Sequence, residues 1–291
     1  MARSLKGFEY FEPSTIAEAT RLLSTYQPKA KVIAAGVDLI SRMRHRKIEP
    51  QYVVSLTNIP GLTDIENDEK SLKFGSMTTL MSLELLLKGD QTYAALYEAI
   101  HNLSSVQVKN TATLVGNLCV ATPASDMASA LCALNAKLKI AGTSGERIVP
   151  IDEFYLDVGK TVLKPDEIVT QVIVPRPGAH SGNAFFNLLR VKCDVAKINV
   201  SASLTLDQDR CQEVRIALGA VAPTIVRAKK AEEQLLQANP FDEKAIAEAA
   251  QTASTEVKPI TDLRSTAEYR QGMTKVLVKR ALEKAWARAK E

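Results

Sequence analysis

Cysteine is scarce in this sequence and is not arranged for metal binding. The residues Cys119, Cys132, Cys193 and Cys211 stand far apart and form no CxxC pair. This spacing excludes a zinc ribbon or an iron–sulfur cluster held by this chain alone. We therefore expect no metal site and interpret the four thiols as small buried apolar groups.

An excess of charge of one sign is also lacking. Lys and Arg number 37 against 33 Asp and Glu, which gives a formal net charge of +4. The two signs are interspersed, and no basic run alternates with aromatic residues, so nucleic-acid binding is not indicated. The basic cluster from Arg42 to Lys47 is interpreted as a solvated helix end or a partner-facing rim.

Common catalytic and membrane motifs are missing as well. His45, His101 and His180 lie in no nucleophile context, and GxSxG, GxGxxG and a Walker A lysine do not occur. No run of about 18 apolar residues is present, and the N-terminal segment has no apolar signal-peptide core. We expect a cytoplasmic protein without a membrane span, which must use unusual loops if it binds a nucleotide.

What is present predicts two domains in 291 residues, of which 46% are hydrophobic. Strands and helices alternate up to Pro175, and Pro177 and Gly178 then punctuate the chain. We place an α/β domain at residues 1–177, with subdomains at about 1–59 and 60–177, and an α+β domain at 178–291. The second domain should contain three antiparallel strands, 185–190, 198–206 and 213–220, followed by helices at about 226–238, 242–252 and 265–289.

The stretch from Thr111 to Ala130 is the most distinctive in the chain. Small and hydroxylated residues surround Gly116 and Asn117, which predict a left-handed turn open to a ligand. Asp126 then opens an apolar helical pattern, and the unpaired N–H groups of such a helix favour an anion such as a diphosphate. An ordinary capped helix after a loop explains the same residues equally well.

A second stretch, from Val32 to Ile40, reads VIAAGVDLI. An apolar strand is broken by Ala34, Ala35 and Gly36 and is followed by helical spacing. This strand, tight turn and helix form an arrangement that phosphate groups use.

With both stretches in view, the chain resembles the FAD-binding medium subunit of the molybdenum hydroxylases, such as carbon monoxide dehydrogenase, xanthine dehydrogenase and aldehyde oxidoreductase. That family has AGGTDL in the first loop and TIGGNxxxxSPxxD in the second. Here residues 34–39 read AAGVDL, and residues 113–126 run from TLVGN to TPASD. Residues 160–175 and the DVAK segment at 194–197 resemble two further family segments, so the resemblance covers essentially the whole chain.

The resemblance implies a fold and a set of cofactor contacts. The fold would be a two-subdomain PCMH-type FAD-binding domain followed by a carbon monoxide dehydrogenase flavoprotein-like C-terminal domain. The residues implied in holding the FAD diphosphate and ribityl chain are Ala34, Ala35, Gly36, Val37, Asp38, Leu39, Thr113, Val115, Gly116 and Asn117. Thr122 and Asp126 would bond cofactor hydroxyl groups.

The flavin ring would lie beside Lys197, because a cation there stabilises the negative charge that reduction builds on the flavin. Leu103, Ile168 and Val169 would also contact the ring. Plain helix capping by Asp126 and a solvated strand lysine at Lys197 are the alternative interpretations. No residue of this chain is expected to be catalytic toward an organic substrate.

The chain departs from the family pattern at Ala35, Val37 and Val115, where the family usually has Gly, Thr and Gly. A Cβ at a position of positive φ costs about 1 kcal/mol or more. The alternative hypothesis is therefore a non-catalytic assembly subunit of the same complex, with weakened or lost FAD binding. A stand-alone flavin oxidase is a third possibility, against which the short C-terminal domain argues.

The resemblance also implies partners. A small subunit would carry [2Fe–2S] clusters and a large subunit molybdopterin, in a dimer of heterotrimers. Electrons would pass through the clusters and FAD to NAD+, a quinone or another acceptor. The sequence does not specify the organic substrate or the acceptor.

Overall fold

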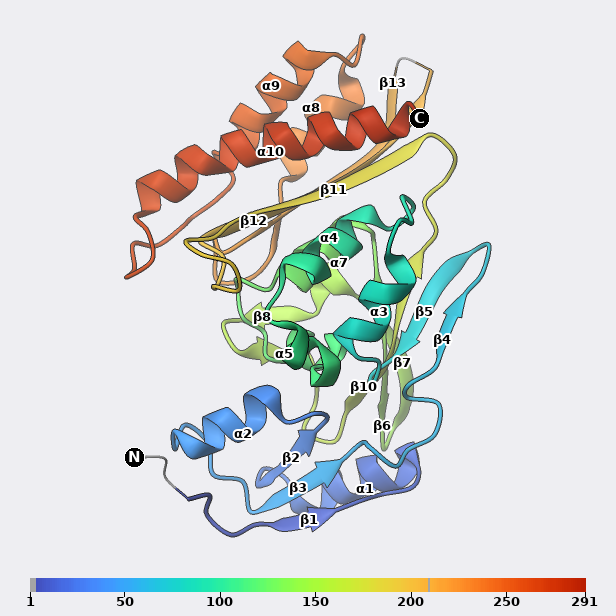
Figure 1. Cartoon of the computed structure of the whole chain (residues 1–291), viewed down its shortest axis with the longest axis vertical. Coiled ribbons are helices and arrows are strands. Elements are labelled where there is room, and N and C mark those ends of the chain that lie inside the picture. Colours follow the sequence, from blue (N-terminus) through green and yellow to red (C-terminus); the bar gives the residue numbers. More distant parts are fainter. Residues whose placement is uncertain (1–3, 209) are drawn as a thin grey trace.

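The chain forms three layers stacked along its longest axis (Figure 1). The computed structural model describes residues 4–208 and 210–291. The N-terminal layer lies at one end, a mixed layer of helices and an antiparallel sheet lies in the middle, and the C-terminal sheet with its helices lies at the other end.

The N-terminal layer is a small parallel sheet with two helices. Its strands have the order β1-β3-β2, and its elements are β1 Glu9–Phe11, α1 Ile16–Tyr26, β2 Ala30–Ile33, α2 Val37–Arg44 and β3 Tyr52–Ser55. The Glu18 N–H donates to Thr15 Oγ1 at 3.1 Å, and the Ser14 N–H donates to Glu18 Oε2 at 2.9 Å. This near-reciprocal cap explains why α1 begins after Thr15.

The middle layer contains an antiparallel sheet of order β4-β5-β10-β6-β7. Its strands are β4 Ile65–Asn67, β5 Ser71–Gly75, β6 Lys137–Gly142, β7 Gly145–Pro150 and β10 Ile168–Pro175. Its helices are α3 Leu80–Leu87, α4 Ala94–Asn102, α5 Val106–Thr111, α6 Leu114–Cys119 and α7 Asp126–Ala133, with η1 at Ile151–Glu153. A hairpin of β8 Tyr155–Asp157 and β9 Lys160–Thr161 completes the layer.

The C-terminal sheet has four antiparallel strands, so the prediction of three is wrong. The strands are β11 Ser181–Leu188, β12 Ile198–Asp207, β13 Arg210–Gly219 and β14 Val226–Arg227. Val226 and Arg227 pair with Leu218 and Ala217, and the helix predicted to begin at Val226 therefore begins at Lys229. A two-residue strand is too short to change the apolar periodicity that predicted a helix.

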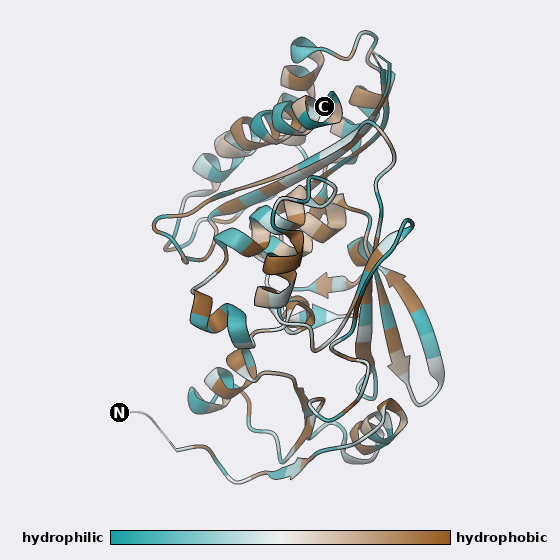
Figure 2. Ribbon diagram, turned by 45° about the vertical axis from the view of Figure 1, so that its right-hand side comes forward, coloured by the Kyte–Doolittle hydropathy of each residue, from teal (hydrophilic) through white to brown (hydrophobic). Residues whose placement is uncertain are grey.

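Three helices accompany this sheet: α8 Lys229–Gln237, α9 Glu243–Ala253 and α10 Ala267–Ala289. Hydrophobic and hydrophilic residues alternate along α10 (Figure 2), as in a helix with one buried face. Its buried residues include Leu277, Val278, Ala281 and Ala285, which pack with β11 and β12. The opposite face of β12 receives α7, and α4 packs on β11.

Each layer has its own hydrophobic cluster, but the clusters meet at particular residues. Ile168 is buried with the N-terminal layer, whereas the next residue, Val169, is buried with the middle layer. Phe185 and Ala217 of the C-terminal sheet pack with the middle cluster. The three layers are therefore joined by shared apolar packing as well as by the chain.

All four cysteines are free thiols, and the expectation that all are buried is wrong for two of them. Cys132 and Cys211 are buried, whereas Cys119 and Cys193 are exposed. Among residues 4–208 and 210–291, no helix combines the length and the apolar character needed to cross a bilayer.

Candidate cofactor site

The first predicted loop lies between β2 and α2 and has the expected tight turn. Gly36 has φ +76° and is the N-cap of α2, with no side-chain cap bond. A Cβ on Gly36 would lie 3.1 Å from side-chain atoms of both Ile33 and Ile40. Both the backbone conformation and the limited space therefore favour glycine here.

The start of α2 offers hydrogen-bond donors. The first helical bond in α2 runs from the Ile40 N–H to the Gly36 carbonyl at 3.0 Å. The N–H groups of Val37, Asp38 and Leu39 have no acceptor among the described residues, as expected for the first turn of a helix. These donors, together with the helix dipole, suit a phosphate group.

The departures from the family pattern in this loop do not strain it. Among the described residues of the loop, Gly36 alone has a positive φ, so the cost expected for Ala35 does not arise. Ala35 and Val37 are exposed, and Ala34 and Leu39 are half-buried. Asp38 lies 3.6 Å from Arg42 on the same helix, which partly neutralises its carboxylate beside the donors.

The second predicted loop is a short helix rather than a turn. Gly116 and Asn117 belong to α6, so the prediction of a left-handed turn is wrong. The Thr113 hydroxyl caps the helix by accepting from the Gly116 N–H at 3.0 Å, and the apolar side chains of Leu114 and Leu118 are buried. A glycine in a six-residue helix masks its helical pattern in the sequence.

Space around α6 is limited, and its side chains divide between core and surface. A Cβ on Gly116 would lie 2.8 Å from Thr113 Oγ1. Val115 is 5% exposed and packs in the middle core, so only its backbone can face a cofactor. The helical backbone at Val115 also removes the strain expected there.

Asn117 connects α6 to α7. The Ser125 hydroxyl donates to Asn117 Oδ1 at 2.7 Å and accepts from the Ala128 N–H as the N-cap of α7. The amide NH2 of Asn117 has no acceptor among the described residues. Thr122 is half-buried and follows Ala121, which has φ +52°. A non-glycine residue at positive φ stores backbone strain of the kind that gathers at functional sites.

Asp126 is a buried carboxylate at the start of α7. Its residue exposure is 4%, and it accepts from the Asn187 amide at 3.0 Å and from the Asn199 amide at 2.7 Å. Burial raises the pKa of Asp126 to about 6, although the two amides act to lower it. A buried carboxylate with a perturbed pKa is a candidate functional group.

The remaining predicted residues lie around the junction of the layers. Leu103 is half-buried beside the middle core and precedes Ser104, which has φ +53°. Ile168 and Val169 are buried, and the pairing of β10 with β6 shifts register between Val169 and Gln171. The Lys197 ammonium lies 5.9 Å from the centre of the Tyr269 ring, and the Lys197 N–H donates to the Leu188 carbonyl.

The two predicted loops lie on facing sides of two layers. In both ribbon views α2 lies across from α5, which directly precedes Thr113 (Figures 1 and 2). Asp126 and the segment containing Lys197 lie where α7 meets the end of the β11–β12 hairpin. The structure therefore links Asn117 to Ser125, the residue before Asp126, whereas Gly36 comes from the opposite layer.

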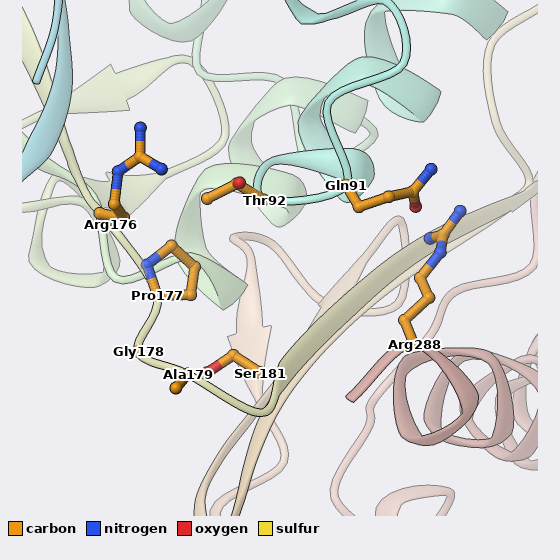
Figure 3. Close-up of a pocket in the computed structure, with 8 residues that line it drawn as sticks. All are labelled: Gln91, Thr92, Arg176, Pro177, Gly178, Ala179, Ser181 and Arg288. Atoms are coloured by element: carbon orange, nitrogen blue, oxygen red, sulfur yellow. The ribbon is translucent and has the colours of Figure 1, made fainter. Parts of the chain in front are cut away.

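A pocket among the described residues lies elsewhere, at the junction between β10 and β11. It has a volume of about 330 Å³, and none of the predicted residues lines it (Figure 3). Its lining includes Arg176, beside the linker residues Pro177 and Gly178, and Arg288 on the other side of the pocket. Arg176 bonds the β4–β5 turn within the middle layer, whereas Arg288, on α10, bonds Glu98 on α4 and so links the C-terminal domain to the middle layer.

The two asparagines that hold Asp126 belong to none of the sequence motifs. A signal was present, because Asn199 interrupts the apolar strand INVSASL, where a buried polar residue needs a partner. The partner itself, Asp126, lies 73 positions away and is not visible from the pattern.

A left-handed glycine before a helix with free N–H donors, and a buried carboxylate in the next layer, are features typical of an α/β cofactor-binding protein. The family described as "FAD binding domain in molybdopterin dehydrogenase" matches residues 6–177. That described as "CO dehydrogenase flavoprotein C-terminal domain" matches residues 183–285.

Relatives match over almost their whole length. The carbon monoxide dehydrogenase medium chain of Hydrogenophaga pseudoflava is 31% identical, over 97% of this chain and 98% of its own. The putative xanthine dehydrogenase FAD-binding subunit of Escherichia coli (strain K12) is 30% identical, over 96% of each chain. The solved carbon monoxide dehydrogenase from Hydrogenophaga pseudoflava that lacks the Mo-pyranopterin moiety superposes with a TM-score of 0.91, over 98% of this chain and 99% of that chain, at 32% identity.

The chain belongs to this family, the FAD-binding medium subunits of the carbon monoxide and xanthine dehydrogenases. It is thus an oxidoreductase subunit of the molybdenum-containing dehydrogenase class.

Proposed function

We propose that this chain binds FAD between its N-terminal and middle layers and acts as the electron-transfer subunit of a molybdenum hydroxylase. The observation that carries the proposal is the whole-length match to medium chains at a TM-score of 0.91. When bound, FAD supplies electron transfer between [2Fe–2S] clusters on a partner and an acceptor such as NAD+ or a quinone.

The chain's own residues would bind and orient the cofactor. The donors at Val37, Asp38 and Leu39 would hold the diphosphate, supported by the left-handed Gly36 turn and the free N–H groups of α2. Ala34, Ala35, Thr113, Val115 and Gly116 would contribute backbone or hydroxyl contacts along the ribityl chain. The free Asn117 amide, the Thr122 hydroxyl and the Asp126 carboxylate would bond cofactor hydroxyl groups.

The ring-binding residues would come from three elements. Leu103 ends α4, and Ile168 and Val169 begin β10, where the register shift interrupts regular pairing. Lys197 would provide a positive charge beside the ring. Its ammonium lies over the Tyr269 ring, and no carboxylate of the described residues forms an ion pair with it.

The proposed complex contains a small [2Fe–2S] subunit and a large molybdopterin subunit, arranged as a dimer of heterotrimers in the cytoplasm. We further propose a FAD-binding domain at residues 1–177, with subdomains at about 1–59 and 60–177, and a C-terminal domain at 178–291. The separate sheets of the three layers support this division.

Absorption spectroscopy and co-purification test the proposal. The chain purified from its native host should bring down an iron–sulfur protein and a much larger molybdopterin protein, and the complex should show flavin absorption bands. A complex containing both partners but no flavin would favour the assembly-subunit hypothesis. A stable homo-oligomer with complete dehydrogenase activity would contradict the proposed complex altogether.

A further inference from the structure

The Asp126 carboxylate is held by the C-terminal sheet rather than by its own domain. Asn187, on β11, donates its amide to one carboxylate oxygen at 3.0 Å, and Asn199, on β12, donates to the other at 2.7 Å. Together the two bonds fix the plane of the carboxylate. No charged side chain of the described residues pairs with it.

The orientation of Asn199 is set by its surroundings. Its amide NH2 donates both to Asp126 and to the Ala124 carbonyl at 3.2 Å, so the NH2 end must point toward α7. Its own carbonyl oxygen is buried without a partner, which is unfavourable. The side chain nevertheless keeps this position, in which both of its donors are used.

Gly219 makes room for this arrangement. A Cβ on Gly219, on the neighbouring strand β13, would lie 2.2 Å from the Asn199 side-chain oxygen. Any larger residue at this position would therefore displace Asn199. Three strands of the C-terminal sheet thus contribute to the placement of one carboxylate.

We infer that Asn187 and Asn199 are positioning residues of the proposed FAD site, which keep Asp126 ionised and oriented to accept a hydrogen bond from a cofactor hydroxyl group. The inference rests on the proposed function. A carboxylate accepts about four hydrogen bonds, so two amide donors leave capacity for a further donor. Because Asp126 is only 4% exposed, its carboxylate can be reached only by a small group such as a hydroxyl.

The amides matter because burial opposes the charged form of Asp126. Burial raises the pKa of Asp126 to about 6 even with both amides in place. No cation of the described residues offsets this effect, because the two amides are the groups that act to lower the pKa of Asp126. Loss of either amide should therefore raise this pKa further and leave less ionised Asp126 at pH 7.

The experiment measures FAD affinity of the full-length chain between pH 5 and pH 8.5, by titrating flavin-free protein with FAD. Wild-type affinity should fall as the pH drops through about 6. In Asn187→Leu and Asn199→Leu the pH of half-maximal affinity should rise by at least half a unit. Affinity at pH 7 should fall about tenfold and recover in part at pH 8.5. Asn187→Asp, which adds a second carboxylate, should show a larger shift.

Asn183→Leu is the matched control. Asn183 is a buried asparagine on the same strand, but it bonds the backbone of Thr92 and Ala95 and does not touch Asp126. The Asn183→Leu substitution should lower the melting temperature and leave the pH profile of FAD binding unchanged. If Asn199→Leu fails to fold, Asn187→Leu provides the same test at a half-buried residue. Gly219→Ala, which should displace the Asn199 side chain, provides a second one.

The outcomes separate the two proposals. Wild-type protein that binds no FAD at any pH would overturn the proposed function. Wild-type protein that binds FAD, with Asn187→Leu showing the same affinity and pH profile, would overturn the positioning role alone.

Discussion

At the scale of single residues, the buried Asp126 carboxylate destabilises the flavin-free protein at neutral pH. Burial raises the pKa of this carboxyl from 3.8 to about 6, so the folded state binds a proton more tightly than the unfolded state. Its contribution therefore favours folding at low pH and is lost as the pH rises from about 4 to 6. Two pKa units correspond to about 3 kcal/mol.

Asp126→Ala should separate cofactor binding from stability. Loss of a charge-assisted hydrogen bond of about 1.5–3 kcal/mol should weaken FAD binding roughly ten- to a hundredfold. Relative to the variant, the free energy of unfolding of flavin-free wild type should increase by about 3 kcal/mol between pH 7 and pH 4. FAD titration and melting curves at both pH values measure the two effects.

Ser125 is the N-cap of α7, so the interpretation of Asp126 as a helix cap is wrong. The remaining alternative is that Asp126 only stabilises the first turn of α7 through the helix dipole, and Ser125→Ala is the control for the helix start. That variant removes the N-cap hydroxyl of α7 and should cost about 1 kcal/mol of stability. If Asp126→Ala lowers stability by a similar amount and retains wild-type FAD affinity, Asp126 is only part of the helix start.

Lys197→Met tests the charge beside the flavin ring. Because the ammonium makes no hydrogen bond or ion pair with the described residues, the substitution should leave the fold intact. Loss of the cation should lower the flavin midpoint potential by about 30 mV, which is about 1.4 kcal/mol for a two-electron couple. Potentiometric titration measures the shift, with Lys192→Met, on the same exposed loop, as the control. Equal flavin midpoint potentials in wild type and Lys197→Met would show that Lys197 is an ordinary solvated lysine.

At the scale of elements, the sequence predicted those whose signals are local. The tight turn at Gly36 was recognisable because an apolar strand, a glycine and helical spacing follow one another within nine residues. The helix α6 was not, because six residues that include a glycine display little periodicity. Likewise β14 exists only through its pairing with β13, which the sequence does not reveal.

The candidate site divides in the same way. Gly36, Asn117 and Asp126 lie in motifs whose residues are close in the chain and could be predicted. Asn187 and Asn199 could not be assigned, because their role depends on α7 meeting a sheet formed some 60 residues later. A local pattern of residues does not show which distant segments meet in the folded chain.

Gly36→Ala tests the first loop as an element. The left-handed φ of +76° and the crowding against Ile33 and Ile40 should cost about 1 kcal/mol of stability and reduce FAD affinity by displacing α2. Gly89→Ala is the matched control, since Gly89 has φ +85° and open space around it. Both variants should melt earlier, and only Gly36→Ala should lose flavin. Equal flavin retention would place the diphosphate elsewhere.

At the scale of the whole molecule, Glu98 links the middle layer to the C-terminal domain by hydrogen bonds and ion pairs. One of its oxygens accepts from Lys284 at 2.7 Å and from Arg288 at 2.6 Å, and the other accepts from the Phe185 N–H at 2.8 Å. Burial acts to raise the pKa of Glu98, but the bonds from Arg288 and Lys284 outweigh it and hold the pKa below its usual value.

Glu98→Gln should therefore loosen the domain junction. Removing the charge leaves Lys284 and Arg288 without their carboxylate, which should cost about 3 kcal/mol at neutral pH. Because the folded pKa is lowered, the stabilisation is present above about pH 4.5 and is lost at lower pH. Melting curves should thus differ at pH 7 and converge as the pH falls through the lowered pKa of Glu98. A constant difference across this range would show that the carboxylate charge is not what matters.

The position of Ile168 has a consequence for the order in which the chain folds during its synthesis. The core of the N-terminal layer contains Ala19, Val54 and Leu62, yet it also contains Ile168, which the ribosome adds more than a hundred residues later. Domains usually fold as they emerge. The core of the N-terminal layer is therefore complete only once Ile168 has been made, and the apolar surface that Ile168 covers stays exposed until then.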